Sequence, residues 1–341
     1  MPELPEVQTT VDGINKTVRG LQIVGVWTNY DSPHYANKEE IKNPLFFKKF
    51  KKIVVGAKIK KASRKAKNIL IELSNDYTIL IHMKMTGHVM YGKYVFDPKG
   101  KSTGSRKGNE KDPWVSTEEG PLTDPFNRHI RLVFALRDTK GLDKRLVLSD
   151  MRKFAKVTVL ETDAIYQSSH LDTVGPEPLS AEFTYSLFES RILTRPTGKI
   201  KTILMDQTVI AGVGNIYSDE ALWISSIHPE EQPQNIPKNN LKKLHKSVIE
   251  VLTQGIDFGG DSMSDYRNIH GERGKFQLQH QAYRRTGKKC EKKGCNGTIQ
   301  RKVVGGRSAH FCSEHQFYED NSLNQKSKST HTKQSPQKQK H

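Results

Sequence analysis

The stretch Met-Pro-Glu-Leu-Pro-Glu-Val at residues 1–7 begins a helix at the very start of the chain. Pro5 suits the first turn of a helix, where a missing N–H costs nothing, and Gly20 suits its end. Apolar side chains recur at helical spacing on one face: Val7, Val11, Ile14 and Val18. We therefore expect an amphipathic helix that holds the N-terminus at a fixed place.

Pro2 becomes chemically distinctive if Met1 is removed, because it then presents a secondary α-amine. An α-amino group titrates at about pH 8, well below lysine, so more of it is nucleophilic at neutral pH. Attack on a sugar C1′ would give an iminium that acidifies the neighbouring carbon, and Glu3 lies beside it as a proton donor and acceptor. Taken alone, Pro2 and Glu3 favour the simpler interpretation, an ordinary acidic helix start.

The composition points to a polyanionic partner. The chain has 341 residues, enough for two domains, and its 55 Lys and Arg against 37 Asp and Glu give a formal net charge of +18. Nucleic acid is the simplest such partner, although charge alone also fits a ribosomal component or another basic protein. No apolar run of about 20 residues and no secretory leader occur, which predicts a cytoplasmic, nucleoid-associated protein with no membrane partner.

Short segments rich in Val, Ile and Leu follow the first helix, and they predict an antiparallel β-sandwich or barrel. The expected strands are Leu21–Trp27, Lys52–Lys60, Ile69–Leu73, Thr78–His82, Ile130–Leu136, Arg145–Leu148 and Lys156–Leu160. A polar stretch at 93–127, rich in Gly, Lys, Ser and Pro, is expected to be a partly disordered loop insertion in this N-terminal domain, residues 1–165.

A linker at 166–180, marked by Gly175, Pro176 and Pro178, precedes a helical domain at 181–285. The expected helices are Ala181–Thr194, Lys199–Asp206, Asn215–Ser225 and Lys238–Gly255. Residues 317–341 are expected to form a disordered basic tail, because the last 21 residues contain five Lys and no acidic residue.

The cysteines form a metal-binding pattern, Cys290-x4-Cys295-x16-Cys312-x2-His315. Two ligand pairs separated by the length of a β-hairpin are typical of a zinc ribbon, and four protein ligands make a zinc site structural. His315 has the spacing of the fourth ligand, whereas His310 would point differently on a strand. We expect one structural Zn²⁺ in a zinc finger at 286–316; the alternative is three free cysteines beside a chance histidine.

Two further segments suit phosphate groups. The turn Ala-Gly-Val-Gly at 211–214 opens a helix, whose free N–H groups and the amide of Asn215 would face an anion. An ordinary N-cap asparagine would look the same. Arg307 follows the glycine-assisted turn of the expected hairpin, where a rigid guanidinium suits a phosphate; a solvated turn arginine is the alternative.

Several of these segments, in their order along the chain, resemble the formamidopyrimidine-DNA glycosylases (MutM), bacterial repair enzymes of the Fpg/Nei family. They are MPELPEV at 1–7, SRKAKN at 63–68, HMKMTG at 82–87, DMRKF at 150–154, ILMDQTVIAGVGNIYSDEALW at 203–223 and GGRSAHFC at 305–312. The resemblance covers about residues 2–316, apart from roughly 93–127. It implies an α+β fold, with an N-terminal helix and antiparallel β-sandwich followed by a helix–two-turn–helix domain that carries a zinc-finger β-hairpin.

The resemblance also implies a role for individual residues. Pro2 would be the nucleophile, with Glu3, Lys67 and Arg307 also in the catalytic set, and Glu6 would recognise the base. Lys67 would bind DNA, and phosphates would be bound by Lys201, Asn215 and Arg307. Three side chains would fill the space left by the extruded nucleotide: Met85, Arg152 and Phe154.

The implied function is that of a bifunctional DNA glycosylase and abasic-site lyase of base excision repair. It would bind damaged double-stranded DNA as a monomer, excise 8-oxoguanine and formamidopyrimidines, and cut the strand by β,δ-elimination. Glu6 and the stretch 259–266, which resembles the loop covering an oxidised purine, favour this substrate over the oxidised pyrimidines of the sister Nei subfamily.

Two features leave room for other interpretations. A catalytically inactive protein that only binds damaged DNA remains an alternative, against which the intact Pro2, Glu3 and Lys67 argue. The zinc finger also departs from the family's usual four cysteines in two x2 pairs, because its first pair is Cys290-x4-Cys295 and its last ligand is His315.

Overall fold

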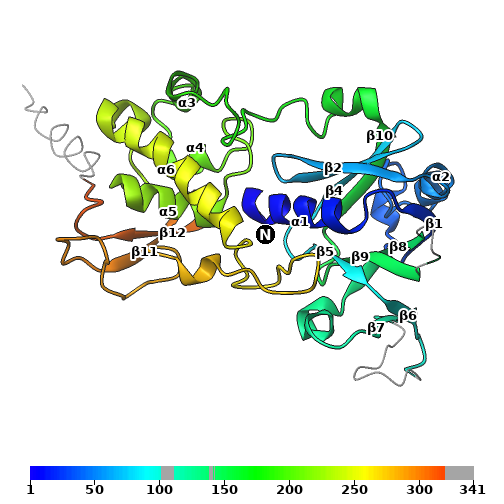
Figure 1. Cartoon of the computed structure of the whole chain (residues 1–341). Helices are drawn as coiled ribbons and strands as arrows, with labels where there is room; N and C mark the ends of the chain where they lie inside the picture. Colours follow the sequence, from blue (N-terminus) through cyan, green and yellow to red (C-terminus); the bar gives the residue numbers. More distant parts are fainter. Residues whose placement is uncertain (101–110, 138–140, 142, 319–341) are drawn as a thin grey trace, which may run out of the picture.

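The computed structural model describes residues 1–100, 111–137, 141 and 143–318. The expected tail at 317–341 therefore lies, apart from residues 317 and 318, outside the described residues. Within them, an N-terminal half of two β-sheets and a C-terminal half of helices and a β-hairpin lie on either side of the chain's first residues (Figure 1).

Helix α1 (Leu4–Thr17) contributes to the cores of both halves. Its apolar face packs on the N-terminal sheets through Val7, Val11, Ile14 and the adjacent Val18. Leu4, at its first turn, belongs instead to the C-terminal core, and its N–H donates to the carbonyl of Gly212 over 3.0 Å. The N-terminus is thus fixed where the two halves meet, as the amphipathic pattern predicts.

Two four-stranded antiparallel sheets form the N-terminal half, in the orders β1-β8-β9-β5 and β10-β4-β3-β2. Alternate residues of each sheet point into one shared core, as Ile69 and Ile71 do on β3, while Leu70 packs on the outer face. The sandwich expected from the sequence is confirmed. Its strands are β1 (Gln22–Thr28), β2 (Ile59–Lys65), β3 (Asn68–Leu73), β4 (Tyr77–His82), β5 (His88–Gly92), β8 (Ile130–Arg137), β9 (Asp143–Ser149) and β10 (Lys156–Glu161).

The strand expected at Lys52–Lys60 is wrong in its first part, because helix α2 (Pro44–Val54) ends there and strand β2 begins only at Ile59. Phe46, Phe50 and Val54 recur every four residues and are buried on one face of this helix. The Asn43 side chain caps it by accepting the N–H of Leu45 over 3.0 Å. The helical period outweighs the β propensity of Ile and Val at its end.

The segment 93–127 is also more ordered than a loop insertion. Strands β6 (Tyr94–Phe96) and β7 (Trp114–Ser116) pair as a hairpin, and the 3₁₀ turns η2 (Pro121–Thr123) and η3 (Pro125–Asn127) follow. Aromatic rings of Phe96 and Trp114 pack edge to face on Trp27 of β1, which attaches the hairpin to the sheet. An insertion is thus present between β5 and β8, but these parts of it are folded rather than loop, and residues 101–110 lie outside the described residues.

The C-terminal half has its own apolar core, built mainly by α5 and α6. Its helices are α3 (Tyr185–Ile192), α4 (Ile200–Leu204), α5 (Asn215–Ser225) and α6 (Lys238–Asp257), and its hairpin is β11 (Ile299–Val304) with β12 (Arg307–Cys312). The remaining 3₁₀ turns are η1 (Pro33–Tyr35), η4 (Thr162–Gln167), η5 (Pro233–Asn235) and η6 (Phe276–Leu278). Across the described ranges, no helix combines the length and hydropathy needed to cross a bilayer.

Candidate functional site

The N-terminal residues line a pocket where the two halves of the molecule meet. Pro2 is buried at this pocket, and Met1, which is exposed, also lines it. The other lining residues come from α1, from the turn after β4, from α5 and from the segment after α6: Glu6, Met85, Ile216, Asp261, Ser264 and Tyr266. The pocket therefore opens directly onto the residue expected to be the nucleophile.

Glu3 lies against the N-terminus of α5. Its Oε1 accepts the N–H of Ile216 over 3.0 Å, and its buried Oε2 has no hydrogen-bond partner among the described residues. The free N–H groups and dipole of a helix N-terminus stabilise a carboxylate there. Glycine at 214 permits this approach, because a Cβ at that position would lie only 2.3 Å from Cδ of Glu3. One carboxylate oxygen is thus anchored and the other is free for proton transfer.

Lys67 is buried at the turn between β2 and β3. Its Nζ donates to the carbonyl of Val213 over 2.8 Å, so the N-terminal sheet contacts the glycine turn of the C-terminal half here. Burial lowers the pKa of the Lys67 ammonium, the carboxylates of Glu3 and Glu6 oppose this shift, and Arg307 adds to it. The charges of all four side chains therefore act on one site.

Glu6 is held by three donors at the wall of the pocket. Its Oε1 accepts the Tyr217 hydroxyl and the Asp261 N–H, each over 2.7 Å, and its Oε2 accepts the Glu3 N–H over 2.7 Å. Burial, with a further contribution from the Glu3 carboxylate, raises the pKa of the Glu6 carboxyl to about 7 despite these donors. Glu6 thus positions the segment that begins at Asp261 and changes its charge near neutral pH.

The three residues expected to fill the space of an extruded nucleotide come from two neighbouring turns. Phe154 is 48% exposed, and the guanidinium Cζ of Arg152 lies 4.5 Å from its ring centroid. The N–H of Arg152 donates to Oγ1 of Thr86 over 3.1 Å, which places this turn beside Met85. An exposed aromatic ring and guanidinium beside the pocket are the features that a wedge into a base stack requires.

A buried carboxylate holds these two turns together. Asp150 accepts the Thr86 hydroxyl over 2.5 Å, the Tyr30 hydroxyl over 2.8 Å and the Ala155 N–H over 2.8 Å. Burial and the Asp150 charge raise the pKa of Tyr30 well above its usual value, so this hydroxyl stays a donor. The exposed side chains of the two turns therefore stand on a rigid base.

The residues expected to bind phosphates differ in their accessibility. Arg307 is exposed beside the tip of the β11–β12 hairpin, and Asn215 begins α5 with its Oδ1 unpaired within the described part of the chain. Lys201, in contrast, is 0% exposed and its Nζ pairs with the buried Asp219. The expectation that Lys201 contacts a phosphate directly is wrong for this structure, because burial in the core has given its charge an internal partner.

Asp219 links Lys201 to the hairpin. Its Oδ2 accepts the backbone N–H of His310 over 2.9 Å and lies 2.9 Å from Nδ1 of the same residue. At the hairpin tip, a Cβ on Gly305 would lie 2.3 Å from the Thr202 side chain of α4, so the tip packs closely on this helix. The buried Lys201–Asp219 pair thus fixes the hairpin that presents Arg307.

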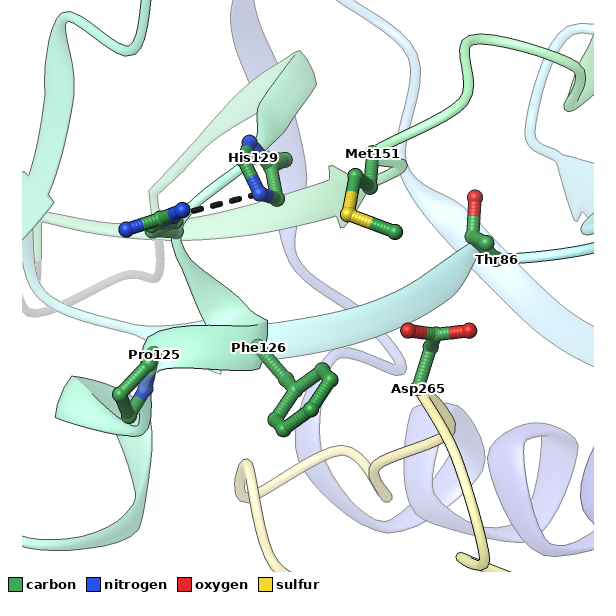
Figure 2. A pocket seen from close by; sticks show the side chains of 7 residues that line it. Thr86, Pro125, Phe126, His129, Met151 and Asp265 are labelled. Atoms are coloured by element: carbon green, nitrogen blue, oxygen red, sulfur yellow. Dashed lines mark hydrogen bonds between the residues drawn. The ribbon is translucent and has the colours of Figure 1, made fainter.

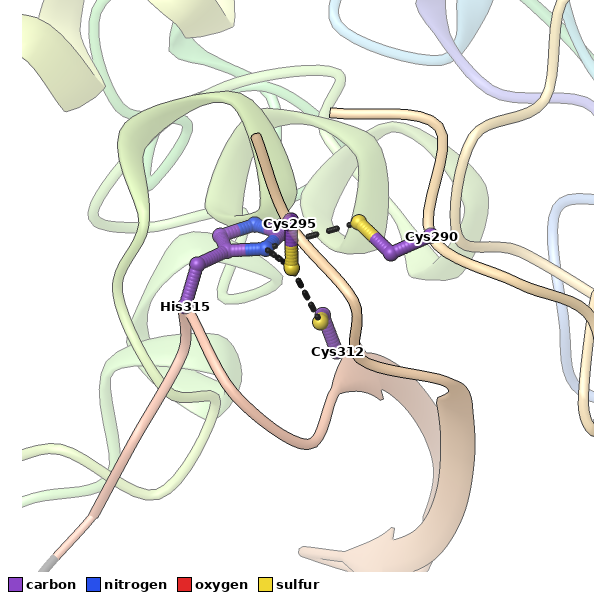
Figure 3. A group of neighbouring side chains, drawn as sticks. All are labelled: Cys290, Cys295, Cys312 and His315. Carbon is purple, nitrogen blue, oxygen red and sulfur yellow. Dashed lines mark hydrogen bonds between the residues drawn. The ribbon is translucent and has the colours of Figure 1, made fainter. Parts of the chain in front are cut away.

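Three cysteines and one histidine lie together at the base of the hairpin (Figure 3). Sγ of Cys295 lies 3.5 Å from Sγ of Cys312, and Nδ1 of His315 lies 3.5 Å from Sγ of both Cys290 and Cys295. Tetrahedral zinc, with bonds of about 2.0–2.3 Å, separates its ligands by roughly 3.4–3.8 Å. The four residues therefore fit a metal ion.

The tautomer of His315 also suits metal binding. Nε2 of His315 lies 3.1 Å from the carbonyl oxygen of Trp223, so it donates its hydrogen there and leaves Nδ1 free as a ligand. His310 is excluded from the metal site, because its ring pairs with Asp219. The fourth ligand expected from the spacing is thus the one that geometry places with the three thiols.

The sequence assigned no individual role to four residues of the site. Tyr217, Asp261 and Tyr266 surround Glu6, and the Tyr266 hydroxyl donates to the Glu6 carbonyl over 3.0 Å. Glu177, in the linker, accepts the Ala66 N–H over 2.6 Å and so holds the turn that carries Lys67. Tyr217 lies within the stretch 203–223, and Asp261 and Tyr266 lie within the stretch 259–266, both of which the sequence indicated. Their contacts with Glu6, and the contact of Glu177 with Ala66, join residues far apart in sequence.

Two family models and several known proteins that match this chain carry the same family name. A family model described as "Formamidopyrimidine-DNA glycosylase N-terminal domain" matches residues 1–157, and one described as "Formamidopyrimidine-DNA glycosylase H2TH domain" matches residues 174–267. Formamidopyrimidine-DNA glycosylase of Lactococcus lactis subsp. cremoris is 32% identical over 313 residues, 92% of this chain and 98% of that protein. The enzyme of Ligilactobacillus salivarius is 34% identical over 312 residues, with 92% and 97% covered.

Solved structures of similar fold contain DNA. The complex between Lactococcus lactis Fpg and an abasic site containing DNA has a TM-score of 0.73 at 30% identity, over 93% of this chain and 100% of that one. The wild-type Lactococcus lactis Fpg (MutM) with N7-benzyl-Fapy-dG containing DNA matches with the same score, identity and coverage. Sequence and fold thus agree over nearly the whole length of both chains.

Proposed function

This chain belongs to the formamidopyrimidine-DNA glycosylase family, and we propose that it excises oxidised purines from damaged double-stranded DNA and then cuts the strand at the abasic site. The observation that carries this function is the convergence of Pro2, Glu3 and Lys67 on the N-terminus of α5. Residues from both halves of the chain meet there in a buried site next to an open pocket. This arrangement combines an amine, a carboxylate and a cation, which together suit imine chemistry at a sugar.

The reaction begins at Pro2 once Met1 has been removed. The Pro2 nitrogen attacks C1′, the bond from C1′ to the base breaks, and the base leaves with that electron pair and with the proton that the Pro2 amine gives up. Glu3, as the carboxylic acid, protonates the ring oxygen O4′, so that the C1′–O4′ bond breaks and the sugar ring opens to an iminium. Its free Oε2 is suited to this transfer, because Oε1 is already held by Ile216.

The iminium then allows the strand to be cut. It makes the proton on C2′ acidic, and loss of this proton expels the 3′ phosphate as the leaving group of a β-elimination. Loss of the proton at C4′ expels the 5′ phosphate in the same way. Lys67 and Arg307 place positive charge at this site, where it stabilises the departing phosphates.

DNA binding uses the surfaces around the pocket. Arg307, Asn215 and Lys67 are proposed to hold the phosphates that flank the lesion, which orients the duplex without reading its sequence. Met85, Arg152 and Phe154 are proposed to occupy the space of the flipped nucleotide, and unstacking costs a few kcal/mol that such contacts offset. Glu6 and the segment from Asp261 would then face the flipped base.

The metal site is proposed to hold one structural zinc. Cys290, Cys295, Cys312 and Nδ1 of His315 supply four ligands with no open position, so the ion has no part in the chemical steps. Zinc would fix the base of the hairpin, while the Lys201–Asp219 pair fixes its side. Both together hold Arg307 in place.

Borohydride trapping tests the proposal. The full chain, with removal of Met1 verified by mass spectrometry, is incubated with 8-oxoguanine DNA, thymine glycol DNA and abasic DNA. We expect a covalent adduct at Pro2 with the first and third substrates and slower excision of thymine glycol. A chain that retains Met1 should form no adduct, since its Pro2 nitrogen is an amide. No adduct from the processed protein would refute the lyase function, and preferential excision of thymine glycol would refute the substrate.

A Pro2→Gly variant tests the nucleophile separately. Its terminal amine is primary and its helix start is less constrained, so we expect trapping to slow. Normal trapping through a lysine, identified by peptide mapping of the adduct, would refute the assignment of Pro2 while leaving the lyase activity intact.

A further inference from the structure

The segment 261–271 forms one wall of the active-site pocket, to which Asp261, Ser264 and Tyr266 contribute. Its first residue is attached to Glu6 through the Asp261 N–H. The Tyr266 hydroxyl also donates to the Glu6 carbonyl, over 3.0 Å. A second attachment joins the wall to the segment 121–127, which lies outside the family resemblance.

Arg267 makes this second attachment, and it is among the largest fully buried side chains of the described chain, at 1% exposed. Its Nη1 donates to the carbonyls of Ser264 and Tyr266, over 3.0 and 2.8 Å. Its Nε and Nη2 donate to Oδ2 of Asp124, over 3.3 and 3.2 Å, and its Cζ lies 4.8 Å from the ring centroid of Phe126. One guanidinium therefore binds the pocket wall with one edge and segment 121–127 with another.

A second contact joins the same two segments. The amide of Asn127 donates to the carbonyl of Gly271 over 3.1 Å and to that of Pro121 over 2.8 Å. A Cβ on Gly271 would lie 2.9 Å from Asn127 Nδ2 and 3.0 Å from Leu122, so the two backbones approach closely. Both segments also line one neighbouring pocket, to which Asp265 and Phe126 contribute (Figure 2).

The segment 121–127 is a firm support. Leu122 is buried in a small apolar cluster with Met90 and Ile130 on the outer face of the N-terminal sheet. Asp124 accepts the Phe126 N–H over 2.8 Å, which caps η3 and orients the carboxylate toward Arg267. A loop held to a rigid sheet at this point loses less conformational entropy when a ligand binds than a free loop would.

We propose that Asp124 and Arg267 are positioning residues for recognition of the damaged base: they hold the wall 264–266 in the conformation that covers a flipped purine. The inference rests on the proposed function and adds a specificity element to it. Neither residue contacts Pro2, Glu3 or Lys67, so cutting of a preformed abasic site, which carries no base, does not depend on this wall. Excision of 8-oxoguanine, in contrast, depends on this wall.

Single-turnover kinetics on the full chain test the positioning role of Asp124 and Arg267. Asp124→Asn keeps the shape of the side chain but removes the charge that pairs with the buried guanidinium. Arg267→Lys keeps the positive charge but removes the planar set of N–H donors that contacts both segments. For both we expect about a tenfold lower kcat/KM on 8-oxoguanine DNA, equivalent to about 1.4 kcal/mol. Cleavage of abasic DNA should stay within about twofold of wild type. Asp124→Glu should recover most of the excision, and Asp76→Asn, which weakens an exposed pair with Lys60, should change neither rate.

The outcomes separate the possible failures. Unchanged excision in both variants, or a parallel fall of excision and abasic-site cleavage, would overturn the positioning role. If Asp124→Asn does not fold, as judged by thermal unfolding, Arg267→Lys decides alone. A wild-type protein that neither excises 8-oxoguanine nor forms an adduct would instead refute the proposed function.

Discussion

Substitution of Gly214 by alanine should disable Glu3 while leaving the fold intact. The backbone at Gly214 is extended, with φ −138°, so an alanine is tolerated there as far as φ is concerned. Its Cβ, however, would lie 2.3 Å from Cδ, 2.5 Å from Oε1 and 2.7 Å from Oε2 of Glu3. Carbon atoms in contact are about 3.5–4.0 Å apart, so the carboxyl group must retreat by roughly 1 Å or more.

That retreat sets the size of the effect. The hydrogen bond from Ile216 holds Oε1 at 3.0 Å, and it would stretch or break as the carboxyl moves. A misplacement of about 1 Å at a reacting group costs about a hundredfold in rate, which corresponds to about 2.7 kcal/mol. Overpacking should lower the free energy of unfolding by only about 1–3 kcal/mol, because the added methyl group overlaps a single side chain.

The assay is borohydride trapping of abasic DNA under single-turnover conditions, with DNA affinity measured separately by fluorescence anisotropy. Gly25→Ala is the matched control, since its Cβ would lie 3.6 Å from that of Ala135, an ordinary contact. We expect the Gly214→Ala protein to be trapped about a hundredfold more slowly than wild type, with a similar affinity for DNA. In the Glu3→Gln background the same substitution should add little, because both changes remove the function of the Glu3 carboxyl group. A folded Gly214→Ala protein that traps within about threefold of wild type would refute the positional role of Glu3.

Three other predictions concern Asp219, His315 and Glu6. Asp219→Asn leaves the Lys201 ammonium buried without an anionic partner and should lower the free energy of unfolding by about 3–5 kcal/mol in urea titrations; a loss below about 1 kcal/mol would contradict this. His315→Ala should lower the zinc content from one ion per chain, measured by atomic absorption, and weaken DNA binding because the hairpin no longer holds Arg307; unchanged zinc content would exclude His315 as a ligand. The pKa of Glu6 is raised from 4.5 to about 7, so the folded state binds more protons between these values and stability should fall by about 3 kcal/mol as pH rises through this window. Glu6→Gln should lack this component in chemical unfolding measured from pH 4 to 8, and an equal slope in both proteins would contradict the assignment.

The sequence alone predicted those parts of the protein that depend on local patterns. Helices α5 and α6 begin where expected, at Asn215 and Lys238, because periodic apolar residues and a glycine turn act over a few positions. The four residues that could hold a metal ion also follow from local spacing, since a β-hairpin brings one pair to the other. The family resemblance rested on short segments of the same kind and was confirmed over nearly the whole chain.

Only the tertiary structure decided which side chains face the site and which serve the core. Lys201 has the sequence context of a phosphate ligand, yet the fold buries it against Asp219. Arg267 looks like a surface residue in a polar stretch, yet the fold buries its side chain and pairs it with Asp124, which is far away in sequence. The physical reason is that burial and pairing of a charge depend on residues that meet only in the fold, and no pattern of neighbours along the chain determines them.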